Sequence, residues 1–253
     1  MARVPATATI IALNESANIV TCIESVRFME EILVVDSGST DNTVALAKSA
    51  GATVLENPWP GYGAQKQFAL THAHHDWIFS LDADERVSKE LAETIVRLFE
   101  SEPELHGYEI NRRNHFLGRP LLHGEGYPDW CLRLFNRKSA CWSPDPVHER
   151  VLFEGSRTRL EGDIDHFSDD SLSEYLLKQN NYTTLQARYL HSLGQRGSVF
   201  KLATSPIMRF FKFYLFRLGF LDGLPGFVHI SIGCFNSFCK YAKLLELDFR
   251  DDL

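Results

Sequence analysis

Residues 77–85 read WIFSLDADE, an apolar run that ends in two aspartates. Side chains of a strand alternate between its two faces, so Asp82 and Asp84 are expected on the same side of the strand end. Two close carboxylates repel each other unless a cation lies between them. A divalent ion with oxygen ligands and positions left open for phosphate meets that need. The motif predicts a site for Mg²⁺ or Mn²⁺, the alternative being a solvated acidic turn.

The residues before this motif alternate between strand and helix patterns. Buried strands are predicted at residues 7–13 and 31–36 and further strands at 52–55 and 77–81, with helical patterns around 19–26, 44–47 and 64–73. Such a series predicts an α/β fold with a parallel sheet and right-handed crossovers. Ligands of these sheets collect at the carboxyl ends of the strands. Asn14, Glu15, Asp36 and the two aspartates all follow strands, so we expect a ligand site at that edge.

The rest of the chain shows three further patterns. A helix capped by Ser88 is expected to end near Pro103. Residues 107–167 are rich in Trp, His, Tyr and Arg, and predict short strands and loops of a substrate-facing half rather than a second core. A helix is predicted over residues 171–193, followed by an apolar, aromatic region over 199–247.

Composition and cysteine usage limit the class of protein. A chain of 253 residues is long enough for one large α/β domain and an appendage. The five cysteines include no C-x-x-C pair, which indicates reduced thiols in a cytosolic compartment. The first residues show no charged segment followed by an apolar one, so no secretion signal is predicted.

Charge is divided unevenly along the chain. Residues 1–174 contain 16 Lys and Arg against 28 Asp and Glu, and residues 175–253 contain 10 against 5. The stretch 175–221 has seven basic residues, no acidic residue and closely spaced phenylalanines. This pattern predicts binding to an anionic membrane surface rather than to nucleic acid. Gly-Leu-Pro-Gly at 223–226 favours an interfacial or re-entrant element over a spanning helix; a helix pair packed on the sheet is the alternative.

Several segments carry a resemblance to a known family. TATIIALNESANI, ILVVDSGSTDNT, GYGAQKQFAL and WIFSLDADE, in this order, resemble the nucleotide-sugar-binding half of family 2 glycosyltransferases with the GT-A fold. HGEGYPDWCLRLFNR, PVHERV and FRLGFLDGLPGF resemble the bacterial β-1,4-glucosyltransferases that act on heptose of the lipopolysaccharide inner core. The resemblance implies a GT-A domain over 1–170, with a nucleotide-sugar half (about 1–100) and an acceptor half (about 101–170). A helical, basic and aromatic extension would follow over 171–253.

The resemblance also assigns roles at the donor site. Residues expected to bind the nucleotide sugar are Leu13, Asn14, Glu15, Asp36, Lys66 and Asp82. Asp36 would contact uracil or ribose and Lys66 the diphosphate, while Asp82, Asp84 and His166 would form the metal site. Alternative interpretations remain: Asn14 and Glu15 as helix caps, Lys66 as a solvated helix charge, and His166 as a core histidine.

The catalytic base has two candidates. Inverting transfer needs a carboxylate that removes the proton of the acceptor hydroxyl, but no covalent intermediate. Glu149 in PVHERV matches the family's acidic base, and Asp129 in GEGYPDW is the second candidate. Asp129 could instead form a structural ion pair with Arg133, and His148 would support Glu149.

The resemblance, together with the metal motif at the sheet edge, implies a metal-dependent inverting glycosyltransferase. It would move a hexose from a UDP-sugar to a lipid-linked or lipopolysaccharide core acceptor. Glucose is the expected hexose, and heptose is the expected acceptor sugar. The enzyme would be a peripheral or monotopic protein on the cytoplasmic face of the inner membrane. The alternatives are another polyprenyl- or polysaccharide-linked acceptor, or an inactive module that binds nucleotide sugar or lipid. A nucleotidyltransferase is disfavoured because ALNESAN lacks a glycine-rich loop with a lysine.

Overall fold

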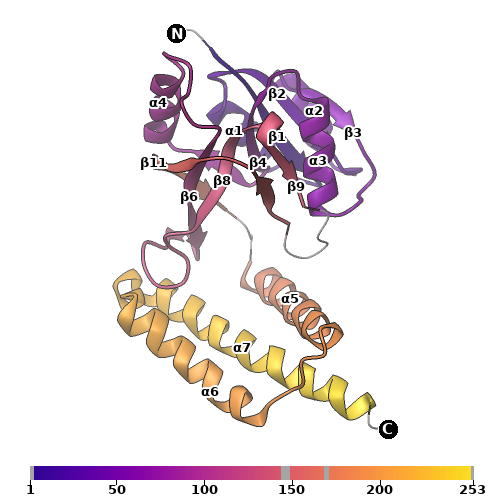
Figure 1. Cartoon of the computed structure of the whole chain (residues 1–253), viewed down its shortest axis with the longest axis vertical. Helices are drawn as coiled ribbons and strands as arrows, with labels where there is room; N and C mark the ends of the chain where they lie inside the picture. Colours follow the sequence, from indigo (N-terminus) through magenta and orange to yellow (C-terminus); the bar gives the residue numbers. More distant parts are fainter. Residues whose placement is uncertain (1–2, 144–148, 168–170, 252–253) are drawn as a thin grey trace. The chain divides into compact units, whose positions relative to one another are not determined.

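The computed structural model describes residues 3–143, 149–167 and 171–251. These residues group into two compact units, drawn in Figure 1. The sheet unit comprises Met1–Arg112 and Asp129–His166, and the helical unit comprises Arg113–Pro128 and Phe167–Leu253. Residues 113–128 therefore group with the C-terminal helices. A domain boundary at residue 170 stays a prediction.

One large sheet organises the sheet unit. Its strand order is β3-β2-β1-β4-β8-β6-β11-β5, and β7 pairs with β6. The bounds are β1 Val4–Ala12, β2 Met29–Asp36, β3 Thr53–Glu56, β4 Trp77–Asp82, β5 Glu85–Val87, β6 Gly107–Phe116, β7 Arg119–Pro120, β8 Trp130–Asn136 and β11 Arg157–His166. Strands β9 (Ala140–Trp142) and β10 (Val151–Phe153) form a separate antiparallel pair.

The first half of the sheet matches the predicted pattern, and the second half differs from it. Strands β3, β2, β1 and β4 are parallel, as predicted. Strand β8 is antiparallel to both β4 and β6, so the sheet becomes mixed. The expectation of short strands over 107–167 is wrong for β6 and β11, which each have ten residues. Their charged side chains interrupt the apolar alternation by which a strand is recognised.

Three helices cover the two faces of the parallel half: α1 Ile19–Ser25, α2 Thr43–Ser49 and α3 Tyr62–His72. Helix α4, Lys89–Leu98, packs against β11. Helices α1 and α2 contact each other, whereas α3 contacts β1 and β2. Strand order reverses after β3, so right-handed crossovers place α3 on the opposite face from α1 and α2.

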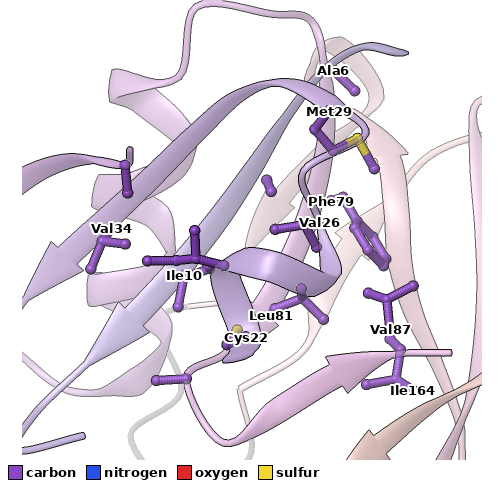
Figure 2. Packing of buried hydrophobic residues seen from close by; sticks show 14 of the residues in the cluster. Ala6, Ile10, Cys22, Val26, Met29, Val34, Phe79, Leu81, Val87 and Ile164 are labelled. Atoms are coloured by element: carbon purple, nitrogen blue, oxygen red, sulfur yellow. The ribbon is translucent and has the colours of Figure 1, made fainter. Parts of the chain in front are cut away.

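Two hydrophobic clusters fill these faces, and β4 contributes to both. Phe79 and Leu81 pack with Cys22 of α1 in the larger cluster (Figure 2). Ile78 packs with Leu70 of α3 in the smaller one. This alternation follows from the two-residue period of a strand. It directs Asp82, which has the parity of Ile78, towards the face that α3 covers.

The strand ends bring the predicted site residues to one edge. Asp36 is the register partner of Ala12, and Asp82 is the partner of Ile11. The carboxyl ends of β1, β2 and β4 therefore coincide, as the sequence predicts. The expected cap of α4 is also present, because Ser88 Oγ accepts a hydrogen bond from Leu91 N at 3.2 Å. This helix ends at Leu98, before Pro103.

The helical unit confirms the predicted C-terminal extension. Its elements are α5 Leu172–Ser192, α6 Val199–Phe210, the π-helical turn η2 Phe211–Phe216, the 3₁₀ turn η3 Gly219–Asp222 and α7 Gly223–Asp251. Helix α7 packs against both α5 and α6 (Figure 1). The Asp222 carboxylate accepts hydrogen bonds from the backbone N–H groups of Leu122 and His123, which ties residues 113–128 to η3.

The helical segment breaks before residues 223–226, slightly earlier than the sequence predicts. Leu218 has a φ of 57°, and α7 already begins at Gly223. Pro225 stands in the first turn of α7, where a missing N–H costs no helical hydrogen bond. Among the described residues, no single helix combines the length and hydropathy of a membrane span. The pair Val199–Phe216 and Gly219–Asp251, bent by 75°, meets both criteria only together.

Candidate active site

A run of seven side chains with alternating charge crosses the edge of the sheet unit. Consecutive members approach within 4 Å through their charged atoms. In order they are Glu149, Lys66, Asp82, Arg133, Glu85, Arg112 and Asp129, referred to below as the charge chain. Four of these residues were predicted site residues, and the structure brings all four into one network.

Lys66 links the metal motif to the candidate base. Its Nζ lies 3.1 Å from Asp82 Oδ1 and 3.3 Å from Glu149 Oε1. The residue is 5% exposed, and its ammonium lies 5.0 Å from the centroid of the Trp142 ring. The alternative of a solvated helix charge is therefore wrong. Helix α3 directs this lysine onto the same face of the sheet as Asp82.

Arg133 and Glu85 form the most buried part of the charge chain. Glu85 is fully buried, and it accepts hydrogen bonds from Arg133 Nη2 at 2.5 Å and from Asp82 N at 2.9 Å. Arg133 Nη2 also lies 3.4 Å from Asp82 Oδ2. Sequence reasoning named Glu85 in no role and Arg133 only as a partner of Asp129. The alternation of WCLRLFN, with a charge among apolar residues of a central strand, is the signal that could have found Arg133.

The electrostatics of this cluster follow from burial and pairing. Burial raises the pKa of Asp82, but Lys66 and Arg133 outweigh it and hold that pKa well below its usual range. Burial also raises the pKa of Glu85, and the neighbouring Asp82 adds to the rise. Burial lowers the pKa of Arg133, but the carboxylates of Glu85 and Asp82 outweigh burial and raise that pKa above its usual value. Asp82 and Arg133 are thus a stably charged pair.

The two candidate bases differ in their contacts. Asp129 accepts hydrogen bonds from Arg112 Nε at 2.9 Å and Nη2 at 2.7 Å. The suggested pair with Arg133 is wrong, because Asp129, directly before β8, lies opposite Arg112 of β6, and Arg133 faces Glu85. The Glu149 carboxylate contacts Lys66 and retains 21% side-chain exposure. Its predicted supporter His148 lies outside the described residues.

A cavity of about 650 Å³ opens beside this network in the sheet unit. Its size is within the usual range for ligand sites, 300–1,000 Å³. Its lining residues are Lys66, Asp82, Glu109, Arg112, Trp130, Cys131, Leu132, Arg133, Trp142, Glu149, Arg150, Val151, Leu152, Phe153 and Arg157. Glu149 therefore shares one cavity with Asp82, whereas Asp129 does not line it.

Asp84 and His166 form a separate pair near the strand end. His166 Nε2 lies 3.3 Å from Asp84 Oδ2, and both side chains are less than a fifth exposed. The carboxylate is a ligand that suits Mg²⁺ and Mn²⁺, whereas an imidazole suits transition-metal ions better than Mg²⁺. Within the described residues, no group of three His, Cys, Asp or Glu side chains is arranged around one ion. The Asp82 carboxylate lies against Lys66 and Arg133 instead, so its place among metal ligands stays a prediction.

The residues predicted to contact the nucleoside order the two loops at this edge. Asp36 is 1% exposed, and it accepts hydrogen bonds from Gly38 N at 2.9 Å and Ser39 N at 2.8 Å. Asn14 has a φ of 57°, and its Oδ1 accepts from Thr40 N at 2.8 Å. These contacts hold the loop after β1 against the loop after β2.

The suggestion that Asn14 and Glu15 cap α1 is wrong, because neither is the N-cap residue and the helix has no side-chain cap hydrogen bond. The N-cap position belongs to Asn18, and Asn14 binds the neighbouring loop instead. The Glu15 carboxylate accepts a hydrogen bond from Asn18 Nδ2 at 2.9 Å. Leu13 is 48% exposed. Direct contact of these residues with a nucleoside stays a prediction.

Comparison with known proteins identifies the family. The profile described as Glycosyl transferase family 2 matches residues 7–140. The chain belongs to this family. The lipopolysaccharide core biosynthesis glycosyltransferase LpsC of Rhizobium meliloti (strain 1021) is 36% identical over 252 residues, which cover 96% of this chain and 93% of LpsC. An uncharacterized glycosyltransferase of Rickettsia felis is 37% identical, covering 94% of this chain and 89% of that protein.

Solved structures show more distant likenesses. S. aureus TarS has a TM-score of 0.47 and 12% identity, covering 72% of this chain and 39% of TarS. Glucosyl-3-phosphoglycerate synthase of Mycobacterium tuberculosis, in complex with Mn²⁺, UDP and glucosyl-3-phosphoglycerate, has a TM-score of 0.45 and 19% identity, covering 77% of this chain and 82% of that one. The family assignment rests on the profile and the close relatives. The chain is thus a family 2 glycosyltransferase with the expected α/β fold of GT-A type.

Removing the cation at the centre of the charge chain should destabilise this glycosyltransferase strongly. Arg133→Met leaves the carboxylates of Glu85 and Asp82 without their shared partner, at an expected loss of about 3–5 kcal/mol in the free energy of unfolding. Glu85→Gln combined with Arg133→Met should recover part of this loss. Urea unfolding measures both, with exposed Arg97→Met as a control that should change stability by less than about 0.5 kcal/mol. Equal stability of Arg133→Met and Arg97→Met would contradict the structural role.

Proposed function

We propose that this glycosyltransferase transfers glucose from UDP-glucose to a heptose of the lipopolysaccharide core, with inversion at the anomeric carbon. The identity to LpsC, which is named for lipopolysaccharide core biosynthesis and matches nearly the whole chain, supports the acceptor class. The observation that carries the proposal is a partly exposed carboxylate, Glu149, on the wall of the cavity that also contains Asp82.

Glu149 is the proposed general base. Its carboxylate accepts the proton of the acceptor hydroxyl while that oxygen attacks the anomeric carbon from the face opposite the leaving UDP. Lys66 holds one carboxylate oxygen at 3.3 Å, which fixes the orientation of the group. Because the attack is a single displacement, the configuration inverts and no second carboxylate is needed as nucleophile.

The cations of the charge chain would stabilise the negative charge that develops on the leaving UDP. Lys66 and Arg133 lie at the carboxyl end of β4, where the diphosphate of a bound nucleotide would be expected. Both are held in place by Asp82 before substrate binds. Donors that are already oriented stabilise developing negative charge without reorganisation during the reaction.

A divalent ion fits the remaining donors at this edge. Asp84 and His166 would hold Mg²⁺ or Mn²⁺, with Asp82 as the neighbouring carboxylate of the motif and phosphate oxygens in the open positions. The bound ion would offset negative charge on the diphosphate. Asp36, Asn14 and the loops that they order would bind the nucleoside.

Replacing the base should separate donor binding from transfer. Glu149→Gln keeps the size of the side chain but cannot accept the proton, so transfer of labelled glucose should fall by roughly two to four orders of magnitude. Affinity for UDP, measured by calorimetry, should stay within about threefold of wild type. Asp129→Asn is the matched comparison. A Glu149→Gln enzyme near wild-type rate, with Asp129→Asn inactive, would transfer the role to Asp129.

We also propose that the helical unit holds the enzyme on the anionic cytoplasmic surface of the inner membrane. Large apolar side chains are exposed on α6, η2 and the start of α7: Phe200 (76%), Met208 (66%), Phe216 (82%) and Leu224 (70%). Lys201, Lys212 and Arg217 are exposed among them. Buried apolar area and attraction to lipid phosphates together drive interfacial binding of this kind.

Vesicle cosedimentation tests the membrane proposal. Neutralising Lys201, Lys212 and Arg217 with Gln should weaken binding to phosphatidylglycerol vesicles mainly at low salt, by about 1 kcal/mol per cation. Phe200→Ser with Phe216→Ser should weaken it at every salt concentration. Phe249→Ser, exposed at the acidic end of α7, is the control and should change little. Wild-type protein that stays in the supernatant at low salt would refute the proposal.

A further inference from the structure

We propose that the outer part of the cavity in the sheet unit binds the acceptor saccharide through a negatively charged group, a phosphate or a carboxylate. This inference rests on the proposed function, because it specifies the acceptor class of the same cavity. Its support comes from an excess of cations on the cavity wall. Five lining residues are basic and three are acidic: Lys66, Arg112, Arg133, Arg150 and Arg157 against Asp82, Glu109 and Glu149.

The inner cations are already paired. Lys66 and Arg133 contact carboxylates of the charge chain, and Arg112 is bound by Asp129. A structural role for their charges is therefore sufficient. These cations do not by themselves indicate an additional ligand.

The outer cations are compensated less completely. Arg157 Nε lies 3.2 Å from Glu109 Oε1, but the same carboxylate also pairs with Arg159 Nε at 3.5 Å. One carboxylate thus faces two guanidinium groups. Arg150 is exposed and forms no ion pair with any residue that the structure describes. Positive charge therefore remains on this wall of the cavity.

Guanidinium groups indicate the kind of ligand. Arginine offers donors only, and its planar fork matches the two oxygens of a carboxylate or phosphate. A neutral sugar would leave this charge uncompensated. Trp130 lines the same cavity and the Arg159 guanidinium lies 4.5 Å from its ring centroid. An aromatic surface beside anion-binding groups suits a sugar ring that carries a charged substituent.

The position of Arg157 separates this subsite from the donor's metal site. Arg157 begins β11 and His166 ends it, nine residues further along the strand. An extended strand of that length spans up to roughly 30 Å. Arg157 is thus remote from the Asp84–His166 pair at which the metal ion is proposed, while Lys66 and Arg133, proposed to bind the diphosphate, line the inner part of the same cavity. Glu149 precedes Arg150 directly in the chain, so the proposed base stands next to the anion-binding wall.

Calorimetry on the full chain saturated with UDP and Mn²⁺ tests this subsite. The probes are glucose 6-phosphate, glucuronate and glucose, with inorganic phosphate as a probe without a sugar ring. The charged sugars should bind at least about tenfold more tightly than glucose, since hydrogen bonds to charged groups contribute about 1.5–3 kcal/mol. Glucose 6-phosphate should also bind more tightly than inorganic phosphate.

Variants then locate the interaction. Arg157→Gln and Arg150→Gln should each weaken glucose 6-phosphate by about tenfold and leave UDP affinity unchanged. Arg27→Gln, which removes an exposed arginine outside the cavity, is the charge-matched control and should alter neither. Loss of UDP affinity in Arg157→Gln would instead assign this arginine to the donor site and overturn the inference.

The remaining outcomes are distinct. Equal binding of glucose and glucose 6-phosphate, or no binding of either, would refute the anionic subsite while UDP binding upholds the proposed donor. Inorganic phosphate that binds as tightly as glucose 6-phosphate would refute saccharide recognition. If wild-type protein fails to bind UDP, the proposed function is wrong and the inference falls with it.

Discussion

The buried contact of Arg133 with Glu85 and Asp82 is the constraint on which the site depends. Glu85 is fully buried and Arg133 is 4% exposed, so neither charge is stabilised by water. Each is tolerated because the other is present. The guanidinium thereby joins β8 to the end of β4 and to β5, which lie more than forty residues earlier in the sequence. Asp82, which the alternation along β4 directs to this face, contacts both Arg133 and Lys66.

In the proposed function, the charge chain gives one edge of the sheet two tasks, binding the diphosphate and holding the base. Cations held between carboxylates are rigid and partly neutralised, which suits binding of a diphosphate without trapping it. At one end of the charge chain, Glu149 lines the cavity and contacts a single cation, Lys66. At the other end, Asp129 is held by both Nε and Nη2 of Arg112 and does not line the cavity. The difference in pairing is the reason to favour Glu149 as base.

The local sequence pattern predicted the strands that position this site, but not which charged side chains pair with each other. Alternation along β4 and the register of the parallel strands follow from apolar periodicity, so the position of Asp82 beside the end of β1 was predictable. The burial of Lys66 was not predictable. The sequence of its helix does not indicate that Glu149, 83 residues later, is a partner of this lysine. Asp129 pairs with Arg112 because the two are opposed across β6 and β8. That register depends on strand pairing, which no local sequence specifies.

Thermal unfolding of the wild-type protein with a panel of nucleotides tests whether this glycosyltransferase binds UDP. Binding of UDP at a concentration near a hundred times its Kd stabilises the native state by about 2.7 kcal/mol, which corresponds to a rise in Tm of roughly 5–10 °C for a chain of this size. We expect such a rise with UDP, larger in the presence of Mn²⁺, and a much smaller one with GDP or CMP. No rise with UDP, or a larger rise with another nucleotide, would contradict this expectation.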